Sequence, residues 1–179
     1  MKKTILTFIM ALFAITTFAQ NESFRIPNGY QGFVEYGPSW HFNKTMSTGI
    51  NLSTTHGFYY NGHIYIGVGL GYDVNENYLM MPIYANLRYV FSNRTFVSPV
   101  ASLRIGSYLS EKIGAYGELA FGVRFASKRD FAVSVMAVGS YYDNIEYGYP
   151  VYDSNGCYVH YVTEKVNPSS FSLRIGIEW

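Results

Sequence analysis

Phe171-Ser172-Leu173-Arg174-Ile175-Gly176-Ile177-Glu178-Trp179 is the most regular stretch of the sequence. Its odd-numbered residues are apolar or aromatic, and its even-numbered residues are serine, arginine, glycine and glutamate. Because successive side chains of a β-strand point to opposite faces of a sheet, this alternation predicts a strand with one apolar and one polar face.

The same alternation recurs along the chain, which predicts an all-β fold. The eight candidate strands are residues 30–37, 46–55, 64–73, 79–91, 97–109, 113–126, 131–142 and 171–179. Tight connections at 92–94 and 127–130 contrast with a long excursion over 143–169. Short turns at one rim and longer loops at the other are typical of an eight-stranded antiparallel up-and-down transmembrane β-barrel.

Charged residues within the candidate strands all fall on the polar face. They are Glu35, Arg88, Arg104, Glu118, Arg124, Arg174 and Glu178, with Asp73 and Asp130 at strand ends. A soluble barrel carries charges on its outside, whereas an arginine or lysine facing lipid costs roughly 2–4 kcal/mol at the bilayer midplane. We therefore expect the apolar faces to contact lipid and the charges to point inward.

An eight-stranded barrel has an interior just wide enough for side chains to fill it. We expect the inward charges to form a salt-bridged plug, with Arg104 facing Glu118 and with Glu35 near Arg174. A narrow ion-conducting path through these charges is the alternative. The inward glycines are expected to make room for large tyrosines. The glycines are at positions 67, 69, 71, 106, 114 and 122, and the tyrosines at 65, 84, 108 and 116.

Aromatic residues of the apolar faces gather near the strand ends, as in the interfacial girdles of membrane proteins. We expect Phe91, Phe125, Phe131 and Trp179 toward the short turns, and Tyr36, Tyr72 and Tyr141 toward the longer loops. Phe96 falls on the opposite parity, which a bulge or a strand beginning at Val97 explains.

The composition excludes several classes of protein. Charged residues are 14% of the 179 residues and aromatic residues 18%, whereas about a quarter of a typical soluble domain is charged. A formal charge of +1 offers no basic surface for nucleic acid. Cys157 is the only cysteine, so an internal disulfide framework is excluded, and the length fits one domain.

The first 19 residues are expected to be a secretory signal peptide. Lys2 and Lys3 precede an apolar stretch, and Ala19 provides a small residue for cleavage before Gln20. A membrane anchor is the alternative, but about 15 apolar residues is fewer than the roughly 20 that a spanning helix needs. No later apolar run is long enough for such a helix, so residues 20–179 are expected to form one barrel domain.

These features together resemble the small outer-membrane β-barrel proteins of Gram-negative bacteria, the OmpA/OmpX-like superfamily. The resemblance implies periplasmic termini, four outer loops, insertion as a monomer into outer-membrane lipid, and a C-terminal strand ending in Trp179 that the barrel insertion machinery reads. It implies no cofactor and no single activity. A secreted soluble lipocalin-like barrel for a small ligand is the alternative, and it requires charged outer faces and an apolar cup.

The excursion over 143–169 is rich in tyrosine. Its tyrosines are Tyr147, Tyr149, Tyr152, Tyr158 and Tyr161. A turn signal at 153–156 predicts a continuous hairpin that pairs Tyr152 with Tyr158 and Phe131 with Trp179. Such a hairpin suits contact with a surface protein or glycan, because tyrosine offers amphipathic area at low entropic cost. A mobile loop with an incidental thiol at Cys157 is the plainer interpretation, and an intermolecular disulfide a weaker one.

Catalytic and metal-binding candidates are sparse. Ser39 and His41 are expected in the first outer loop, and His160 with Glu164 in the last, without a recognisable hydrolase context. We therefore expect no enzyme, with a lipid-modifying outer-membrane enzyme as the alternative. His56 and His63 flank a predicted turn around residues 59–61, but a metal there lacks a third ligand.

Overall fold

The computed structural model describes residues 26–42, 46–75, 79–109, 113–128, 131–143, 145–152 and 158–179, so the expected signal peptide, the turn signal at 153–156 and Cys157 lie outside the described residues. The described strands are β1 (Gly29–Phe42), β2 (Met46–Tyr60), β3 (Ile64–Asn75), β4 (Leu79–Val90), β5 (Val97–Leu109), β6 (Ile113–Lys128), β7 (Phe131–Tyr142), β8 (Ile145–Tyr152), β9 (Tyr158–Val166) and β10 (Ser169–Glu178). No helix in this part of the chain is long and apolar enough to cross a membrane.

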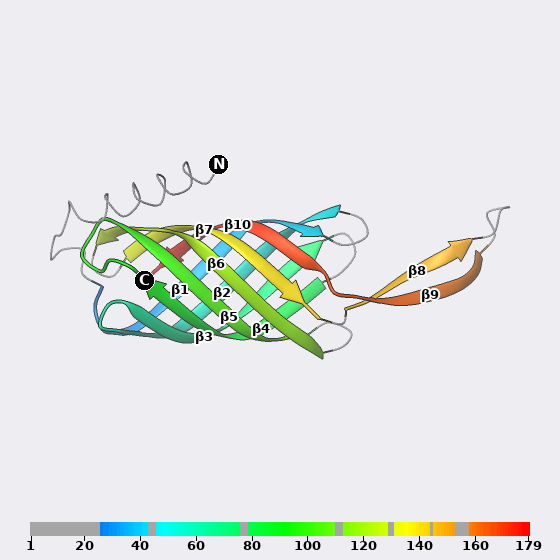
Figure 1. Cartoon of the computed structure of the whole chain (residues 1–179), viewed down its shortest axis with the longest axis horizontal. Helices are drawn as coiled ribbons and strands as arrows, with labels where there is room; N and C mark the ends of the chain where they lie inside the picture. Colours follow the sequence, from blue (N-terminus) through cyan, green and yellow to red (C-terminus); the bar gives the residue numbers. More distant parts are fainter. Residues whose placement is uncertain are drawn as a thin grey trace, which may run out of the picture.

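Eight of these strands form a closed antiparallel barrel in the order β1-β10-β7-β6-β5-β4-β3-β2, and β8 and β9 form a separate two-stranded sheet. This confirms the predicted eight-stranded up-and-down architecture. We call the β8–β9 sheet the ribbon; Figure 1 shows it projecting from one end of the barrel along the barrel's long axis. That end is called the loop rim. The opposite end, which carries the turn at residues 61–63 and Trp179, is called the short-turn rim.

The barrel closes between its first and last strands. Tyr36 pairs with Ile175 within the β1–β10 register, and the backbones of Gly32 and Trp179 exchange two N–H···O bonds of 3.0 Å each. The predicted partner of Trp179 was Phe131, but the β7–β10 ladder ends one residue earlier, at Ala132 and Glu178. The expected register is thus present, while the last residue pairs with β1 because it completes the closure of the barrel.

The side of the barrel wall on which each residue lies follows the apolar–polar alternation of the sequence. Val68 is 67% exposed and Phe121 61% on the outside, whereas Arg104 on the inside is 1% exposed. The expected girdle aromatics also point outward; they are Tyr36, Tyr72, Phe91, Phe125, Phe131, Tyr141 and Trp179. Phe96 is exposed too, and its parity is explained by the second of the two possibilities, since β5 begins at Val97.

The first hairpin extends further than its sequence pattern predicts. β1 continues to Phe42 and β2 to Tyr60. The turn that joins β2 to β3 follows at Asn61 and Gly62, with φ of 52° and 67°. Pro38 hides the continuation of β1, because proline lacks the N–H of a regular strand, although Trp40 and Phe42 keep the outward parity. The expectation that Ser39 and His41 lie in an outer loop is therefore wrong: both belong to β1.

Inward glycines allow inward tyrosines to pack against the wall. A Cβ atom on Gly67 would come within 2.7 Å of the Tyr65 ring, and one on Gly69 within 2.6 Å of the Tyr84 ring. Such distances are shorter than van der Waals contact, so at these positions the wall needs a residue without a side chain.

Candidate functional site

Seven inward charges form one continuous chain of alternating sign through the lumen, which we call the ion-pair chain. From the short-turn rim its members are Arg124, Glu178, Arg88, Glu35, Arg104, Glu118 and Arg174. They come from β1, β4, β5, β6 and β10, and each residue is at most 3% exposed. Alternation of sign means that every charge in the chain has at least one opposite neighbour, which offsets the desolvation of burial.

Glu35 is the central link of the ion-pair chain. One carboxylate oxygen accepts a 2.8 Å bond from Arg88, and the other pairs with Arg104. Arg88 continues toward the short-turn rim through a 3.7 Å contact with Glu178, which binds Arg124 at 2.7 Å. A single carboxylate on β1 thus connects arginines from β4 and β5, so it links distant walls of the barrel.

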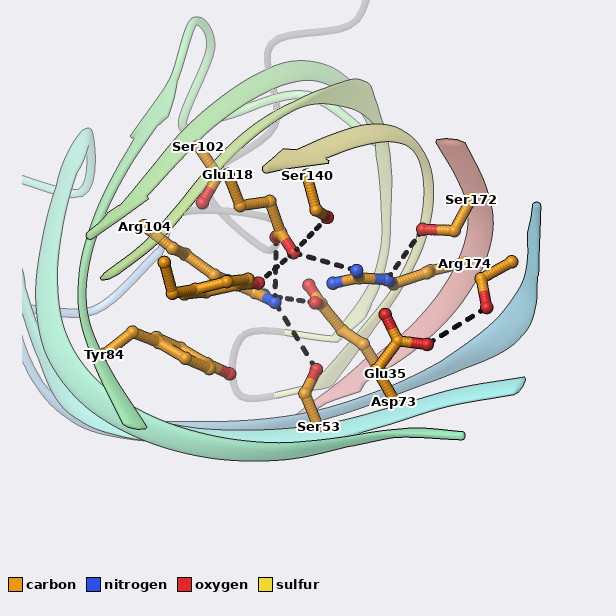
Figure 2. Close-up of polar contacts among 12 residues, drawn as sticks. Glu35, Ser53, Asp73, Tyr84, Ser102, Arg104, Glu118, Ser140, Ser172 and Arg174 are labelled. Carbon is orange, nitrogen blue, oxygen red and sulfur yellow. Dashed lines mark hydrogen bonds and ion pairs between the residues drawn. The ribbon is translucent and has the colours of Figure 1, made fainter. Parts of the chain in front are cut away.

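Arg104, Glu118 and Arg174 form the part of the ion-pair chain that is nearer the loop rim. Arg104 contacts Glu118 at 3.1 Å, and Arg174 contacts the same carboxylate at 2.8 Å (Figure 2). Serine hydroxyls also contact these charges: the Ser140 hydroxyl donates to Glu118 at 3.3 Å, and Arg174 donates to the Ser172 hydroxyl at 3.1 Å. The charges are therefore held by neutral donors and acceptors as well as by one another.

The pairs are partly those expected. Arg104 does face Glu118 across β5 and β6. Glu35 lies near Arg174, as expected (Figure 2), but its ion pairs are with Arg88 and Arg104, because the β1–β10 register sets it opposite Gly176. Aromatic rings also support the arginines: the guanidinium of Arg88 lies 4.2 Å from the centre of the Phe33 ring.

Buried apolar and aromatic side chains fill the lumen on both sides of the ion-pair chain. The cluster that reaches the short-turn rim contains Ile26, Phe33, Tyr59, Tyr65, Val90, Val100, Ala120, Met136 and Val138. The cluster toward the loop rim contains Met80, Tyr84, Tyr108, Tyr116 and Tyr142. Every member of both clusters is at most 3% exposed. Buried side chains therefore lie on both sides of the ion-pair chain.

Comparison with solved structures gives a similar barrel. The crystal structure of Neisserial surface protein A (NspA) matches with a TM-score of 0.56 at 12% identity, covering 84% of this chain and 98% of that one. The N-terminal β-barrel domain of Pseudomonas aeruginosa OprF matches with a TM-score of 0.47 at 8% identity, covering 86% of this chain and all of that one. The fold is that of a small outer-membrane β-barrel. No protein-family model matches the sequence, and no curated protein matches it significantly.

A second polar group lies inside this outer-membrane-type barrel, near the loop rim. His41 Nε2 is 3.0 Å from Ser39 Oγ and 3.1 Å from Asp73 Oδ1, and the Ser39 hydroxyl donates to the same oxygen at 3.1 Å. The Tyr142 hydroxyl donates to Asp73 Oδ2 at 2.8 Å. Asp73 was not among the predicted catalytic candidates, although its place on the polar, inward face of β3 indicates that it points into the lumen.

This arrangement is not a catalytic triad. A triad uses one imidazole nitrogen toward the nucleophile and the other toward the acid, whereas here Ser39 and Asp73 both lie at Nε2 of His41. All three side chains are at most 1% exposed, so the Ser39 hydroxyl is buried in this conformation. The group acts as a polar link between β1, β3 and β7.

The other histidine candidates do not converge. His56 points outward, where Tyr30 and Thr54 hydroxyls lie 2.6 and 3.1 Å from its two nitrogens, while His63 Nδ1 lies 2.7 Å from the Val90 carbonyl oxygen. In the ribbon, His160 is opposite Val151 and Glu164 opposite Tyr147, so the register does not pair them with each other. No group of three or more His, Cys, Asp or Glu suited to a metal occurs among the residues that the structure describes.

The ribbon lies between β7 and β10 in the chain and projects beyond the barrel (Figure 1). The predicted pair of Tyr152 with Tyr158 is present, but the predicted hairpin is not continuous: β8 and β9 form a sheet separate from β7 and β10, and a register shift at Val151 displaces the rest of the ribbon by one residue. The base of the ribbon is fixed to the loop rim: the Tyr142 N–H donates to the Pro168 carbonyl at 3.1 Å, and the Tyr108 hydroxyl donates to the Asp143 carbonyl at 2.7 Å. The tyrosines at 147, 149, 152 and 161 lie on these two strands, and Tyr158 is 60% exposed.

Proposed function

We propose that this chain is an outer-membrane protein with a sealed barrel, and that its ribbon makes contacts at the cell surface. The observation that carries the proposal is the division of the molecule: the buried charges lie in the barrel lumen, while two paired strands project from the loop rim. A signal peptide over residues 1–19 fits export to that membrane.

The membrane placement rests on the distribution of charge. All eight buried Arg, Glu and Asp residues of the described strands point inward, four of each sign, and the outward faces are apolar. A lipocalin-like soluble barrel has the reverse arrangement, with a charged exterior and an apolar cup. Cell fractionation with a heat-dependent gel shift tests this point, and recovery in the soluble periplasm without a shift contradicts it.

The sealed state rests on the ion-pair chain and the two apolar clusters around it. A path for ions must displace fully buried rings at both levels and also separate paired charges, so we expect no steady conductance. Recordings in planar bilayers measure this directly. A steady large conductance from the wild-type protein contradicts the seal and favours the narrow channel.

The surface role rests on the ribbon. It lies outside the barrel wall, and its tyrosine-rich strands suit contact with a protein or a glycan. Deleting residues 147–161 should leave insertion and the heat-dependent gel shift intact and abolish binding of the purified protein to its surface ligand. Y30F, a conservative change at the short-turn rim, serves as the control; unchanged binding after the deletion leaves the ribbon without this role.

A further inference from the structure

The two edges of the ribbon differ in their ability to accept another strand. Each of β8 and β9 pairs on one side only, within the described residues. β8 contains Gly148 and Pro150, and proline lacks the backbone N–H that a ladder of hydrogen bonds needs. β9 runs from Tyr158 to Val166 and contains neither proline nor glycine. The register shift opposite Val151 and Tyr152 leaves Val159 outside the ladder, so the regular stretch of β9 is residues 160–166. The outer edge of β9 is therefore the one that can bind an extended strand.

We propose that this edge binds β9 of a second copy of the chain, forming a four-stranded sheet in the order β8-β9-β9-β8. The proposal rests on the surface role proposed above and names its partner. In a two-fold antiparallel pairing, residues of one parity meet residues of the same parity, because alternate residues direct their N–H and C=O groups to the same edge. A register centred on Val162 satisfies this condition and pairs residues 160–164, which lie within the regular stretch.

In that register the sequence of β9 is complementary to itself. His160 meets Glu164 of the second copy, and this pair occurs twice by symmetry. Tyr161 meets Thr163, an aromatic residue opposite a β-branched one, which is a favourable cross-strand pair. Val162 meets Val162 of the second copy, so no like charges are opposite one another. Moving the centre by one residue in either direction removes the His160–Glu164 pairs.

The direction of the ribbon determines where the two barrels lie. Figure 1 shows the ribbon extending along the barrel's long axis, so antiparallel pairing of two ribbons sets the barrels at opposite ends of the shared sheet. Five paired residues at about 3.4 Å each give an overlap of about 17 Å. Two barrels at opposite ends of such a sheet belong to two apposed membranes. The inference is thus homophilic contact between membranes, with each barrel inserted singly.

Vesicle clustering tests this proposal with the full chain. Phosphatidylcholine vesicles carrying the wild-type protein should cluster, measured as a rise in turbidity, and vesicles carrying the 147–161 deletion should not. In H160E, residues 160 and 164 of the symmetric pair are both acidic. In H160K/E164K, both are basic. Each variant alone should cluster at least tenfold more slowly than the wild type, while a mixture of the two vesicle populations should cluster again because the charges are then complementary.

The mixture separates this pairing from a simple loss of structure, since two damaged ribbons do not restore one another. Heat-dependent gel shifts verify that each variant barrel is folded. Wild-type vesicles that cluster no faster than the deletion vesicles overturn the homophilic pairing, as does a mixture that stays dispersed. Binding of wild-type protein to a different surface ligand, with no vesicle clustering, retains the proposed surface role and rejects this partner.

Discussion

The barrel and the ribbon differ in whether the edges of their strands are paired. Each barrel strand is paired on both sides, and each charge of the ion-pair chain has an opposite charge in contact. In the ribbon, each strand has one paired side and one unpaired side among the described residues. The barrel wall therefore offers no strand edge to a partner, whereas the ribbon presents edge backbone groups to which another strand can pair.

The largest effect in the barrel is expected at Glu35. Replacing it with glutamine (Glu35→Gln) removes the negative charge between Arg88 and Arg104, which are each 1% exposed in the native barrel. Breaking a buried ion pair on one side costs about 3–5 kcal/mol. Urea unfolding in detergent micelles, followed by tryptophan fluorescence, should show this loss.

The control for Glu35→Gln is Ser107→Ala, a change on the outward face of β5. Its unfolding midpoint should match that of the wild type. An unchanged midpoint for Glu35→Gln would mean that water enters the lumen and solvates the arginines, and the contrast between a closed barrel and an open ribbon would then disappear.

A smaller effect is expected where the barrel wall meets an inward ring. Gly69→Ala places a Cβ atom 2.6 Å from the Tyr84 ring and 2.5 Å from the Thr54 carbonyl oxygen. Overpacking of this kind costs about 1–3 kcal/mol. Gly117→Ala is the matched control, because a Cβ there meets nothing within 4 Å. Equal stability of the two variants in urea titrations would show that the lumen is loosely packed.

The alternation of apolar and polar residues predicted much of the barrel, but few of the contacts between charges inside it. Lipid requires an apolar outer face at every second residue, so the alternation of 171–179 indicated which side Arg174 and Glu178 occupy. The register across the turn between β5 and β6 likewise predicted the contact of Arg104 with Glu118. These features depend on one strand or on two neighbouring strands, and such local relations are readable in the sequence.

Contacts across the lumen depend on the whole circumference. Glu35 meets Arg88, 53 residues away, only after every strand has found its partner and the barrel has closed. The approach of Asp73 to His41 has the same origin, and Pro38 additionally concealed that His41 belongs to a strand. Such contacts need the register of several strands together, which a single sequence pattern does not supply.

The junction of barrel and ribbon should respond modestly to one lost hydrogen bond. Tyr142→Phe removes the hydroxyl that donates to Asp73 at 2.8 Å and keeps the ring within its aromatic cluster. A single buried hydrogen bond contributes about 1 kcal/mol. The neighbouring Tyr141→Phe is the control, since Tyr141 points outward at 46% exposure. Thermal unfolding of the two variants compares them; a larger loss for Tyr141→Phe contradicts the polar link at the loop rim.

The smallest effect on the barrel is expected from removing the ribbon itself. In the deletion of residues 147–161, the Tyr142–Pro168 and Tyr108–Asp143 hydrogen bonds at the base remain, and β8 and β9 pair only with each other. The free energy of barrel unfolding should therefore change by less than about 0.5 kcal/mol, the usual range for surface changes. Urea titration of the deletion and the wild type measures it. A loss of unfolding free energy as large as that of Glu35→Gln would show that the ribbon stabilises the barrel. The ribbon would then be explained by folding, without a partner at its unpaired edge.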